Sequence, residues 1–208
     1  MLNHKGFDQW SGEYDKDILR MQYEGYPFEG YYDTLGTIQQ KVLACQAKSV
    51  FDIGIGTGLL SEVLYREGIR ITGIDFSEQM LAQAKVKMPE GVFIQFDINN
   101  GIPSVLQDKK FDCIISSYAI HHINDMQKVE LIRNLTDSLH PGGWILIGDV
   151  AFETEQSMLA VKAKSNGWDE SEYYMIADQT IWALKQEGIQ ANFIKTSSCS
   201  GVLMIPQQ

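Results

Sequence analysis

A glycine-rich segment that directly follows an apolar run constrains the fold of this chain most strongly. Residues 50–58 read Val-Phe-Asp-Ile-Gly-Ile-Gly-Thr-Gly, and an apolar stripe at helical spacing follows them. Glycine tolerates the positive φ angles of a tight turn and lets a ligand approach the main chain closely. A purely structural turn would use the same glycines. The segment therefore predicts a strand, a turn and a helix, with a ligand at the turn as the favoured interpretation.

From Lys48 onward, short apolar runs alternate with longer segments of helical periodicity, a pattern typical of β-α-β units and a parallel sheet. The predicted strands span residues 49–53, 69–74, 92–96, 113–116 and 144–147. The predicted helical stripes are Leu59, Leu60, Val63 and Leu64; Met80, Leu81 and Ala84 behind a Ser77 cap; and Ile132, Leu135 and Leu139, ended by Pro141-Gly142-Gly143. Ligands of such sheets bind at the carboxyl ends of the strands.

The two ends of the chain differ from this core. Residues 155–166 and 172–187 predict helices, and residues 191–205 predict two strands that turn near 198–201. An antiparallel pair there would complete a doubly wound, mostly parallel seven-stranded sheet of an α/β protein. Residues 1–45 are rich in aromatics and predict short helices, packed over the ligand edge of the sheet or merely covering an apolar edge of the core. We expect one domain, 1–208, made of a helical cap (1–45), a cofactor-binding core (46–150) and a helical insertion with a sheet-closing hairpin (151–208).

Composition narrows the classes of partner and the compartment. The 27 acidic residues exceed the 17 Lys and Arg, and this net charge of -10 opposes a nucleic-acid partner. Three cysteines without a Cys-x-x-Cys pair suggest neither a disulfide framework nor a thiolate zinc site. The first ten residues lack the apolar stretch of a signal peptide, and no apolar segment of 18 residues occurs. We expect a cytoplasmic protein that works away from membranes.

Acidic residues near the glycine turn indicate the kind of ligand. Asp75 ends the second strand, 17 positions beyond Gly58, where a carboxylate can accept hydrogen bonds from both ribose hydroxyls. A dinucleotide is disfavoured, because Leu59 occupies the position that requires a small residue, and a P-loop is excluded, because no Gly-Lys-Ser/Thr follows. Asp52 would be a poor neighbour for pyrophosphate and a good one for a cationic amino-acid group. The sequence therefore predicts a nucleoside ligand with positive charge.

These motifs resemble the cofactor signature of class I methyltransferases dependent on S-adenosylmethionine (SAM). The resemblance rests on Asp52-x-Gly-x-Gly-x-Gly, Gly73–Ser77, Phe96-Asp97-Ile98, Phe111–Ser117 and Leu139–Gly143. Residues 7–15, 116–122 and 148–152 are also similar to a group of small bacterial methyltransferases of largely unassigned substrate. The resemblance implies SAM as cofactor, S-adenosylhomocysteine (SAH) as product, and a tyrosine at Tyr14 that closes over the methionine end. The implied cofactor-binding residues are Tyr14, Asp52, Gly54, Gly56, Asp75, Phe76, Met80, Asp97, Ile98 and Ser116.

Methyl transfer from SAM is an in-line displacement that needs no covalent enzyme intermediate. Positioning of the reactants is worth roughly 7 to 11 kcal/mol, more than the ~3 to 5 kcal/mol of acid-base catalysis. His121 and His122 follow the fourth strand, and either could be a general base or only cap the next helix. With Tyr14 they are the candidate catalytic residues. A metal site is not expected, because adjacent side chains diverge and no His or Cys stands at ligand spacing.

The acceptor side involves two further candidates. Tyr118 and Asp149, with His121, are candidate substrate-binding residues, although Tyr118 would equally suit core packing and Asp149 a capping role. We expect a small-molecule acceptor and a monomer or homodimer.

Three other functions compete with this interpretation. A non-catalytic SAM-binding module would be expected to show a degraded glycine turn. A nicotinamide oxidoreductase is opposed by Leu59. A nucleic-acid methyltransferase usually carries Asn/Asp-Pro-Pro-Tyr/Phe where this chain has Ser116-Ser117-Tyr118-Ala119.

Overall fold

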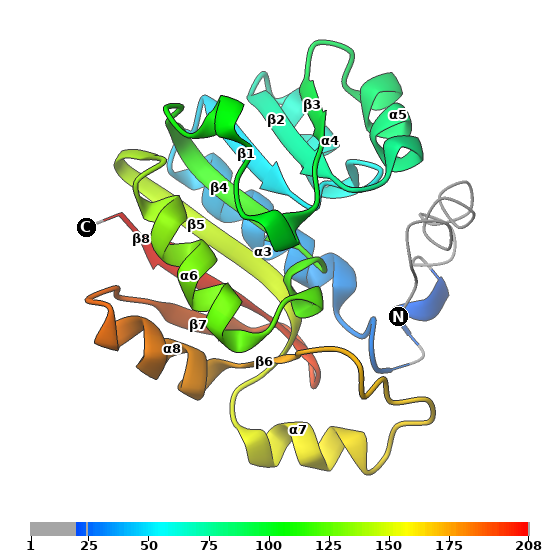
Figure 1. Ribbon diagram of the computed structural model, residues 1–208. Helices are drawn as coiled ribbons and strands as arrows, with labels where there is room; N and C mark the ends of the chain where they lie inside the picture. Colours follow the sequence, from blue (N-terminus) through cyan, green and yellow to red (C-terminus); the bar gives the residue numbers. More distant parts are fainter. Residues whose placement is uncertain (1–19, 24, 208) are drawn as a thin grey trace.

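The computed structural model describes residues 20–23 and 25–207 and shows a mixed sheet flanked by helices (Figure 1). Seven strands lie in the order β3-β2-β1-β4-β5-β8-β7, and the short β6 pairs with β5 beside this path. The bounds are β1 Ser49–Ile53, β2 Arg70–Asp75, β3 Val92–Gln95, β4 Phe111–Ser117, β5 Leu139–Phe152, β6 Met175–Ile176, β7 Asn192–Lys195 and β8 Ser200–Pro206. The predicted doubly wound α/β sheet is confirmed, with β6 as an addition.

Register places the carboxyl ends of the central strands together. Ile53 of β1 lies beside Ile74 of β2 and Ser116 of β4, all in parallel pairs. β8 runs antiparallel to β5 and to β7, as the predicted hairpin requires. The strand order reverses between β1 and β4, and ligands of open α/β sheets bind at such a switch point.

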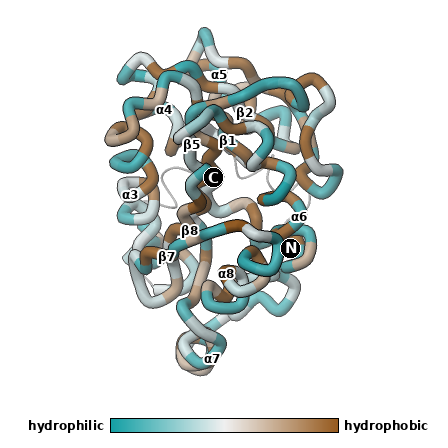
Figure 2. The backbone as a smooth tube through the Cα atoms, turned by 90° about the vertical axis from the view of Figure 1, so that its left-hand side faces the viewer, coloured by the Kyte–Doolittle hydropathy of each residue, from teal (hydrophilic) through white to brown (hydrophobic). Residues whose placement is uncertain are grey.

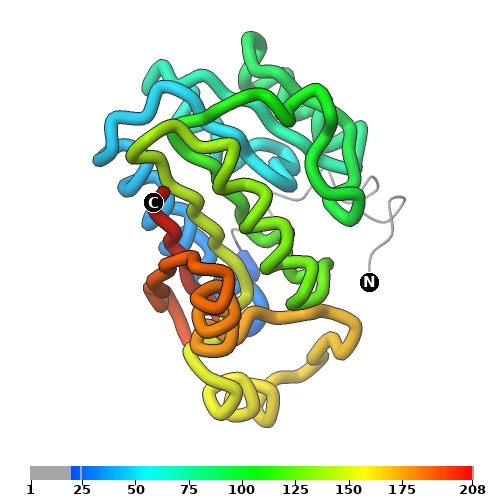
Figure 3. The backbone as a smooth tube through the Cα atoms, turned by 60° about the vertical axis from the view of Figure 1, so that its left-hand side comes forward, coloured from blue at the N-terminus to red at the C-terminus, as the bar shows by residue number. Residues whose placement is uncertain are grey.

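Helices cover both faces of the sheet. Their bounds are α3 Tyr31–Ala44, α4 Leu59–Arg66, α5 Glu78–Lys87, α6 Asp125–Thr136, α7 Glu155–Lys162 and α8 Ala177–Gln186, with short 3-10 turns at Ile98–Asn100, Ser104–Leu106 and Ile120–His122. One apolar cluster joins the sheet to α3, α4 and α5, and a second joins its other face to α6 and α8. Figure 2 shows hydrophobic stretches concentrated in the middle of the molecule, where the strands run. Figure 3 shows α6 and α8 on one face, and α7 beyond the end of β5.

Local signals set several helix starts. The Ser77 hydroxyl accepts a hydrogen bond from the Met80 amide and caps α5, as predicted. Asn124 and Gln127 form a reciprocal capping box at the start of α6. α4 begins directly after Gly58, whose φ of 81° ends the glycine turn.

Three sequence-based assignments were wrong in detail. α6 ends at Thr136, so Leu139 belongs to β5, and Pro141-Gly142-Gly143 lies inside that strand. There Phe111 of β4 pairs with Leu139 of β5, but Cys113 pairs with Trp144, so β5 bulges between these pairs. The bulge accommodates Pro141 and the positive φ of Gly142. The helix expected from residue 172 starts at Ala177, because Met175 and Ile176 pair with β5.

The structure describes part of the predicted cap. Of the segment 1–45, the structure describes α3 and the turns before it, and α3 packs against β5, β8 and α4. None of the described helices is long and apolar enough to cross a membrane.

Candidate functional site

A cavity lies at the carboxyl ends of β1, β2 and β4. Its walls come from the glycine turn, the ends of β2 and β3, the loop after β4 and the first residue of α3. The lining residues are Tyr31, Gly54, Ile55, Gly56, Thr57, Leu59, Leu60, Ile74, Asp75, Phe76, Met80, Phe96, Ile98, Ser117, Tyr118, Ala119 and His122. The cavity therefore occupies the place that the strand order and the glycine motif predict.

The glycine turn is held close to its neighbours. The amides of Gly54 and Ile55 both donate to the Ile74 carbonyl, at 2.9 and 3.0 Å. Gly54 has a φ of +70°, and a Cβ at this position would lie 2.3 Å from the Ala119 Cβ. Gly56 has a φ of +54°, but a Cβ there would meet nothing within 4 Å. Backbone conformation thus favours glycine at both positions, whereas packing requires it only at 54; at 56 a side chain would enter the cavity, which Gly56 lines.

Asp75 connects the turn to α5. Its Oδ2 accepts from the Gly56 amide and its Oδ1 from the Ser77 amide, both at 2.9 Å. Burial raises the pKa of this carboxyl, and the bonds from Ser77 and Gly56 oppose the rise. A carboxylate has about four lone-pair sites, so it can still accept hydrogen bonds from a ligand's hydroxyls.

Asp52 lies in β1 just before the turn, is buried and does not line the cavity. Its Oδ2 accepts from the Ser61 hydroxyl at 2.6 Å. Its Oδ1 is the one buried side-chain oxygen or nitrogen without a hydrogen-bond partner among the described residues. Burial raises the pKa of Asp52 to about 7, although the Ser61 bond works against the rise. A cation bound above the turn would stabilise the ionised form.

Six of the ten predicted cofactor-binding residues line the cavity: Gly54, Gly56, Asp75, Phe76, Met80 and Ile98. Ser116 is buried, and its hydroxyl donates to the Ile53 carbonyl at 2.8 Å, so its neighbour Ser117 lines the cavity instead. Asp97 accepts from the Asn99 amide and caps the turn that carries Ile98. Asp52, Asp97 and Ser116 therefore do not line the cavity. Tyr14 lies outside the described residues.

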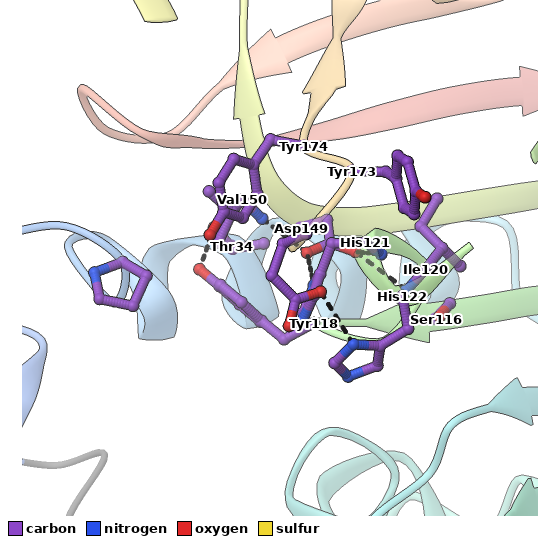
Figure 4. Close-up of polar contacts among 12 residues, drawn as sticks. Thr34, Ser116, Tyr118, Ile120, His121, His122, Asp149, Val150, Tyr173 and Tyr174 are labelled. Carbon is purple, nitrogen blue, oxygen red and sulfur yellow. Dashed lines mark hydrogen bonds and ion pairs between the residues drawn. The ribbon is translucent and has the colours of Figure 1, made fainter. Parts of the chain in front are cut away.

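His121, the neighbour of the cavity-lining His122, forms a hydrogen-bonded pair with the buried Asp149 (Figure 4). The Nδ1 of His121 lies 2.6 Å from Asp149 Oδ1, and the Asp149 side chain is 1% exposed. Burial disfavours the charged imidazolium, but the charge of Asp149 and its hydrogen bond outweigh this effect and raise the pKa of His121. Burial likewise opposes ionisation of Asp149, but His121 lowers its pKa overall. Asp149 also accepts the amides of Ile120, His121 and Val150, so its oxygens organise the loop.

His122 projects into the cavity wall and has a carboxylate partner of its own. Its Nδ1 lies 3.0 Å from Oε2 of Glu172, a residue 50 positions later in the loop before β6. The rings of His121 and His122 are 4.2 Å apart between centroids. The Tyr173 amide donates to the His121 carbonyl at 2.8 Å, which fixes this loop against the turn Ile120–His122. The adjacent histidines therefore converge with Glu172.

Tyr118 forms part of the cavity wall with an unusual backbone. Its φ is +50°, rare for a bulky residue. The ring stacks on Tyr31 with centroids 4.4 Å apart, and the hydroxyl donates to Thr34 Oγ1 at 3.4 Å. Burial raises the pKa of Tyr118 well above its usual range. The ring is thus fixed from α3, and one of its sides borders the cavity.

Several residues that line the cavity, and Glu172 that contacts His122 at its wall, were not found from the sequence. Tyr31 lies in the aromatic segment 1–45, where no pattern separates it from its neighbours. Glu172 lies in a segment that the periodicity assigned to a helix. Phe96 and Ser117 stand next to predicted residues, and the alternation of side chains along a strand would have indicated Ser117.

Comparison with known proteins identifies the family. Residues 50–143 match a family described as a methyltransferase domain. An uncharacterized methyltransferase of Alkaliphilus oremlandii is 35% identical over 72% of this chain and 68% of its own length. The chain belongs to this methyltransferase family. A second such methyltransferase, from Geobacillus kaustophilus, is 28% identical over 97% of the chain and 95% of its own length.

Solved structures agree with this membership. The methyltransferase superimposes on the DhpI–SAH complex with a TM-score of 0.69 at 17% identity, covering 97% and 93% of the two chains. It matches magnesium protoporphyrin IX methyltransferase from Synechocystis, solved with SAH, with the same score and identity over 97% and 98%. The methyltransferase family that the glycine motif indicated is confirmed by the family match and the curated relatives, and the solved structures share the fold of this chain.

Proposed function

We propose that this methyltransferase transfers the methyl group of SAM to a small-molecule acceptor that lies against Tyr118, Ala119 and His122. The observation that carries the proposal is that His122 shares one cavity with the glycine turn and Asp75. The residues proposed to hold the cofactor and the ionisable side chain of His122 therefore face the same cavity.

The residues around the cavity fit SAM. Asp75 has acceptor capacity for ribose hydroxyls, and Gly56 leaves room for a ligand next to the main chain. Phe76, Met80 and Ile98 supply apolar surface for a flat ring. Asp52, two residues before Gly54, has an unpartnered oxygen and a pKa raised to about 7, so a bound cationic cofactor would favour its ionised form. Tyr14 is retained in the proposal as the residue that closes over the methionine end.

When bound, the cofactor supplies a methyl group on a sulfonium sulfur, which a nucleophile displaces in line. The chain contributes mainly by holding the acceptor at attack distance in the cavity, since positioning is worth roughly 7 to 11 kcal/mol. Tyr31 and Tyr118 narrow the cavity from the side of α3. His121 and His122, each bonded to a carboxylate, activate the nucleophilic atom of the acceptor.

A small acceptor suits both the charge and the walls. The chain carries a net charge of -10, which disfavours a polyanionic substrate. The cavity wall combines stacked aromatic rings with a half-buried histidine, an arrangement typical of small-molecule sites.

The test is formation of SAH with a panel of small thiols, amines and hydroxy acids, comparing wild type, His122→Ala and His140→Ala. His140 is exposed at the start of β5 and serves as the matched control. We expect His122→Ala to lower turnover by about 10²-fold or more with SAM affinity retained, and His140→Ala to leave it unchanged. A loss below about tenfold in His122→Ala would remove His122 from the mechanism.

A further inference from the structure

Three side chains that the sequence did not bring together converge beside the cavity. His121, His122 and Glu172 each offer one ligand atom, and these atoms all lie within 4.8 Å of one another. We propose that they bind one divalent transition-metal ion at the acceptor end of the cavity. The proposal rests on the proposed function and specifies how the two histidines activate the acceptor.

The donor set suits a borderline metal ion. Two imidazoles and one carboxylate are typical ligands of Zn²⁺, Fe²⁺, Co²⁺ and Mn²⁺, and three protein ligands leave positions open for substrate. Two ligands that each lie about 2.0–2.2 Å from one ion are themselves roughly 3 Å apart. His122 Nδ1 and Glu172 Oε2 are separated by 3.0 Å. The ligand atom of His121 lies within 4.8 Å of these two atoms, so a rotation of its side chain would have to bring it to the same ion.

Asp149 supplies the outer support that metal-bound histidines use. A ligating histidine almost always donates its other ring N–H to a carboxylate or carbonyl, which fixes the ring. The Nδ1 of His121 lies 2.6 Å from the buried Asp149, so its Nε2 is left for the ion. Asp149 is itself fixed by three amides from Ile120, His121 and Val150.

The loop that carries Glu172 is anchored next to the histidines. Tyr173 donates its amide to the His121 carbonyl. The buried Lys128 of α6 contacts the Tyr173 carbonyl and, at 2.9 Å, Asp125 Oδ1. The carboxylate of Asp125 balances the positive charge of Lys128. The carboxylates of Asp149 and Glu172 therefore give the group of side chains around His121 and His122 a negative charge. The backbone next to Glu172 is therefore held in place before an ion binds, which lowers the ordering cost of binding.

A metal ion at this wall indicates the class of acceptor. The acceptor would be a small molecule whose hydroxyl or thiol ligates the ion, for example a hydroxy acid or a thiol acid. Coordination lowers the pKa of that group, and its proton passes to solvent water. A lone pair on the oxygen or sulfur then forms the new bond to the methyl carbon as the carbon–sulfonium bond breaks, leaving a neutral thioether in SAH.

The experiment uses Co²⁺ alone as probe, without SAM or acceptor, on full-length protein freed of metal by a chelator. The chain has four histidines, so His4→Gln and His140→Gln are combined as a background in which His121 and His122 remain. Glu172→Gln and Asp149→Asn are introduced into it, with Glu170→Gln as matched control. Glu170 lies in the same loop and bonds Lys162 at 2.6 Å. Visible absorption of Co²⁺ reports nitrogen and oxygen ligands, and calorimetry gives affinity and stoichiometry.

We expect one Co²⁺ per chain in the background, affinity reduced at least about tenfold in Glu172→Gln, and by about 10- to 100-fold in Asp149→Asn. Glu170→Gln should bind like the background. Equal affinity in Glu172→Gln and Glu170→Gln, or no saturable binding, would overturn the metal site. Calorimetry with SAM in the same background separates the two proposals. Binding of Co²⁺ without binding of SAM would refute the proposed function alone. Binding of SAM without binding of Co²⁺ would refute the metal site alone.

Discussion

Replacing Gly54 by alanine tests how the glycine turn is packed against the loop that leads to the histidines. The added Cβ would lie 2.3 Å from the Cβ of Ala119, a distance that neither atom can relieve by rotating a side chain. The backbone at Gly54 is also in the left-handed region, with a φ of +70°. Gly56→Ala is the matched control, because its φ is +54° and its Cβ would meet nothing within 4 Å.

The expected losses follow from these two contributions. A left-handed conformation costs a non-glycine residue roughly 1–2 kcal/mol, which both variants share. Overpacking in a rigid site adds about 1–3 kcal/mol, which only Gly54→Ala incurs. We therefore expect the free energy of unfolding to fall by about 1–2 kcal/mol in Gly56→Ala and by about 2–5 kcal/mol in Gly54→Ala.

Urea unfolding of wild type, both single variants, Ala119→Gly and the pair Gly54→Ala/Ala119→Gly measures these losses. Removing the Ala119 methyl group eliminates the clash, so the double variant should recover about 1–3 kcal/mol relative to the sum of the singles. Equal losses in Gly54→Ala and Gly56→Ala, or additive behaviour in the double variant, would refute the close approach of the turn to Ala119.

Two further predictions concern groups close to the turn. Because burial raises the pKa of Asp52 to about 7, the folded protein binds a proton there more tightly than the unfolded chain does. The free energy of unfolding should therefore fall by up to about 4 kcal/mol as the pH rises from about 4 to 7. Asp52→Asn should remove this slope in urea midpoints measured across that range, and an unchanged slope would contradict the assignment. Ser77→Ala should cost about 0.5–2 kcal/mol by removing the α5 cap, whereas Ser104→Ala, at an exposed 3-10 turn, should cost little; equal midpoints in urea would exclude the cap.

Local patterns predicted the elements that local interactions determine. The strand 49–53 matches β1 residue for residue, because its apolar run ends at a glycine. The Ser77 cap was also correct, since a cap depends on residues three apart. The strand 144–147 was too short, because β5 gains residues by pairing with β8 and β6 at its far end. Pairing between distant segments is not visible in a hydrophobic period.

The candidate site shows the same division. The glycines were found because they form a turn directly after a strand, and Asp75 was found because it ends the next strand. Glu172 was not, because its approach to His122 depends on the Tyr173–His121 bond and on Lys128. Asp52 was expected to bind the cofactor; it is buried and does not line the cavity, and its role toward the cofactor stays a prediction. The division into one domain with a cap, and the monomer or homodimer, stay predictions.

The most direct test of the central claim, that SAM binds in the cavity at the glycine turn, is calorimetric titration with SAM and SAH of wild type, Gly56→Ala and Gly58→Ala, with NAD as control ligand. Gly56 lines the cavity, whereas a Cβ at Gly58 would point to the Met88 side chain. We expect both sulfur ligands to bind wild type and NAD to remain silent. Affinity should fall at least about tenfold in Gly56→Ala, equivalent to about 1.4 kcal/mol, and little in Gly58→Ala. No binding of SAM or SAH, or equal losses in the two variants, would contradict the claim.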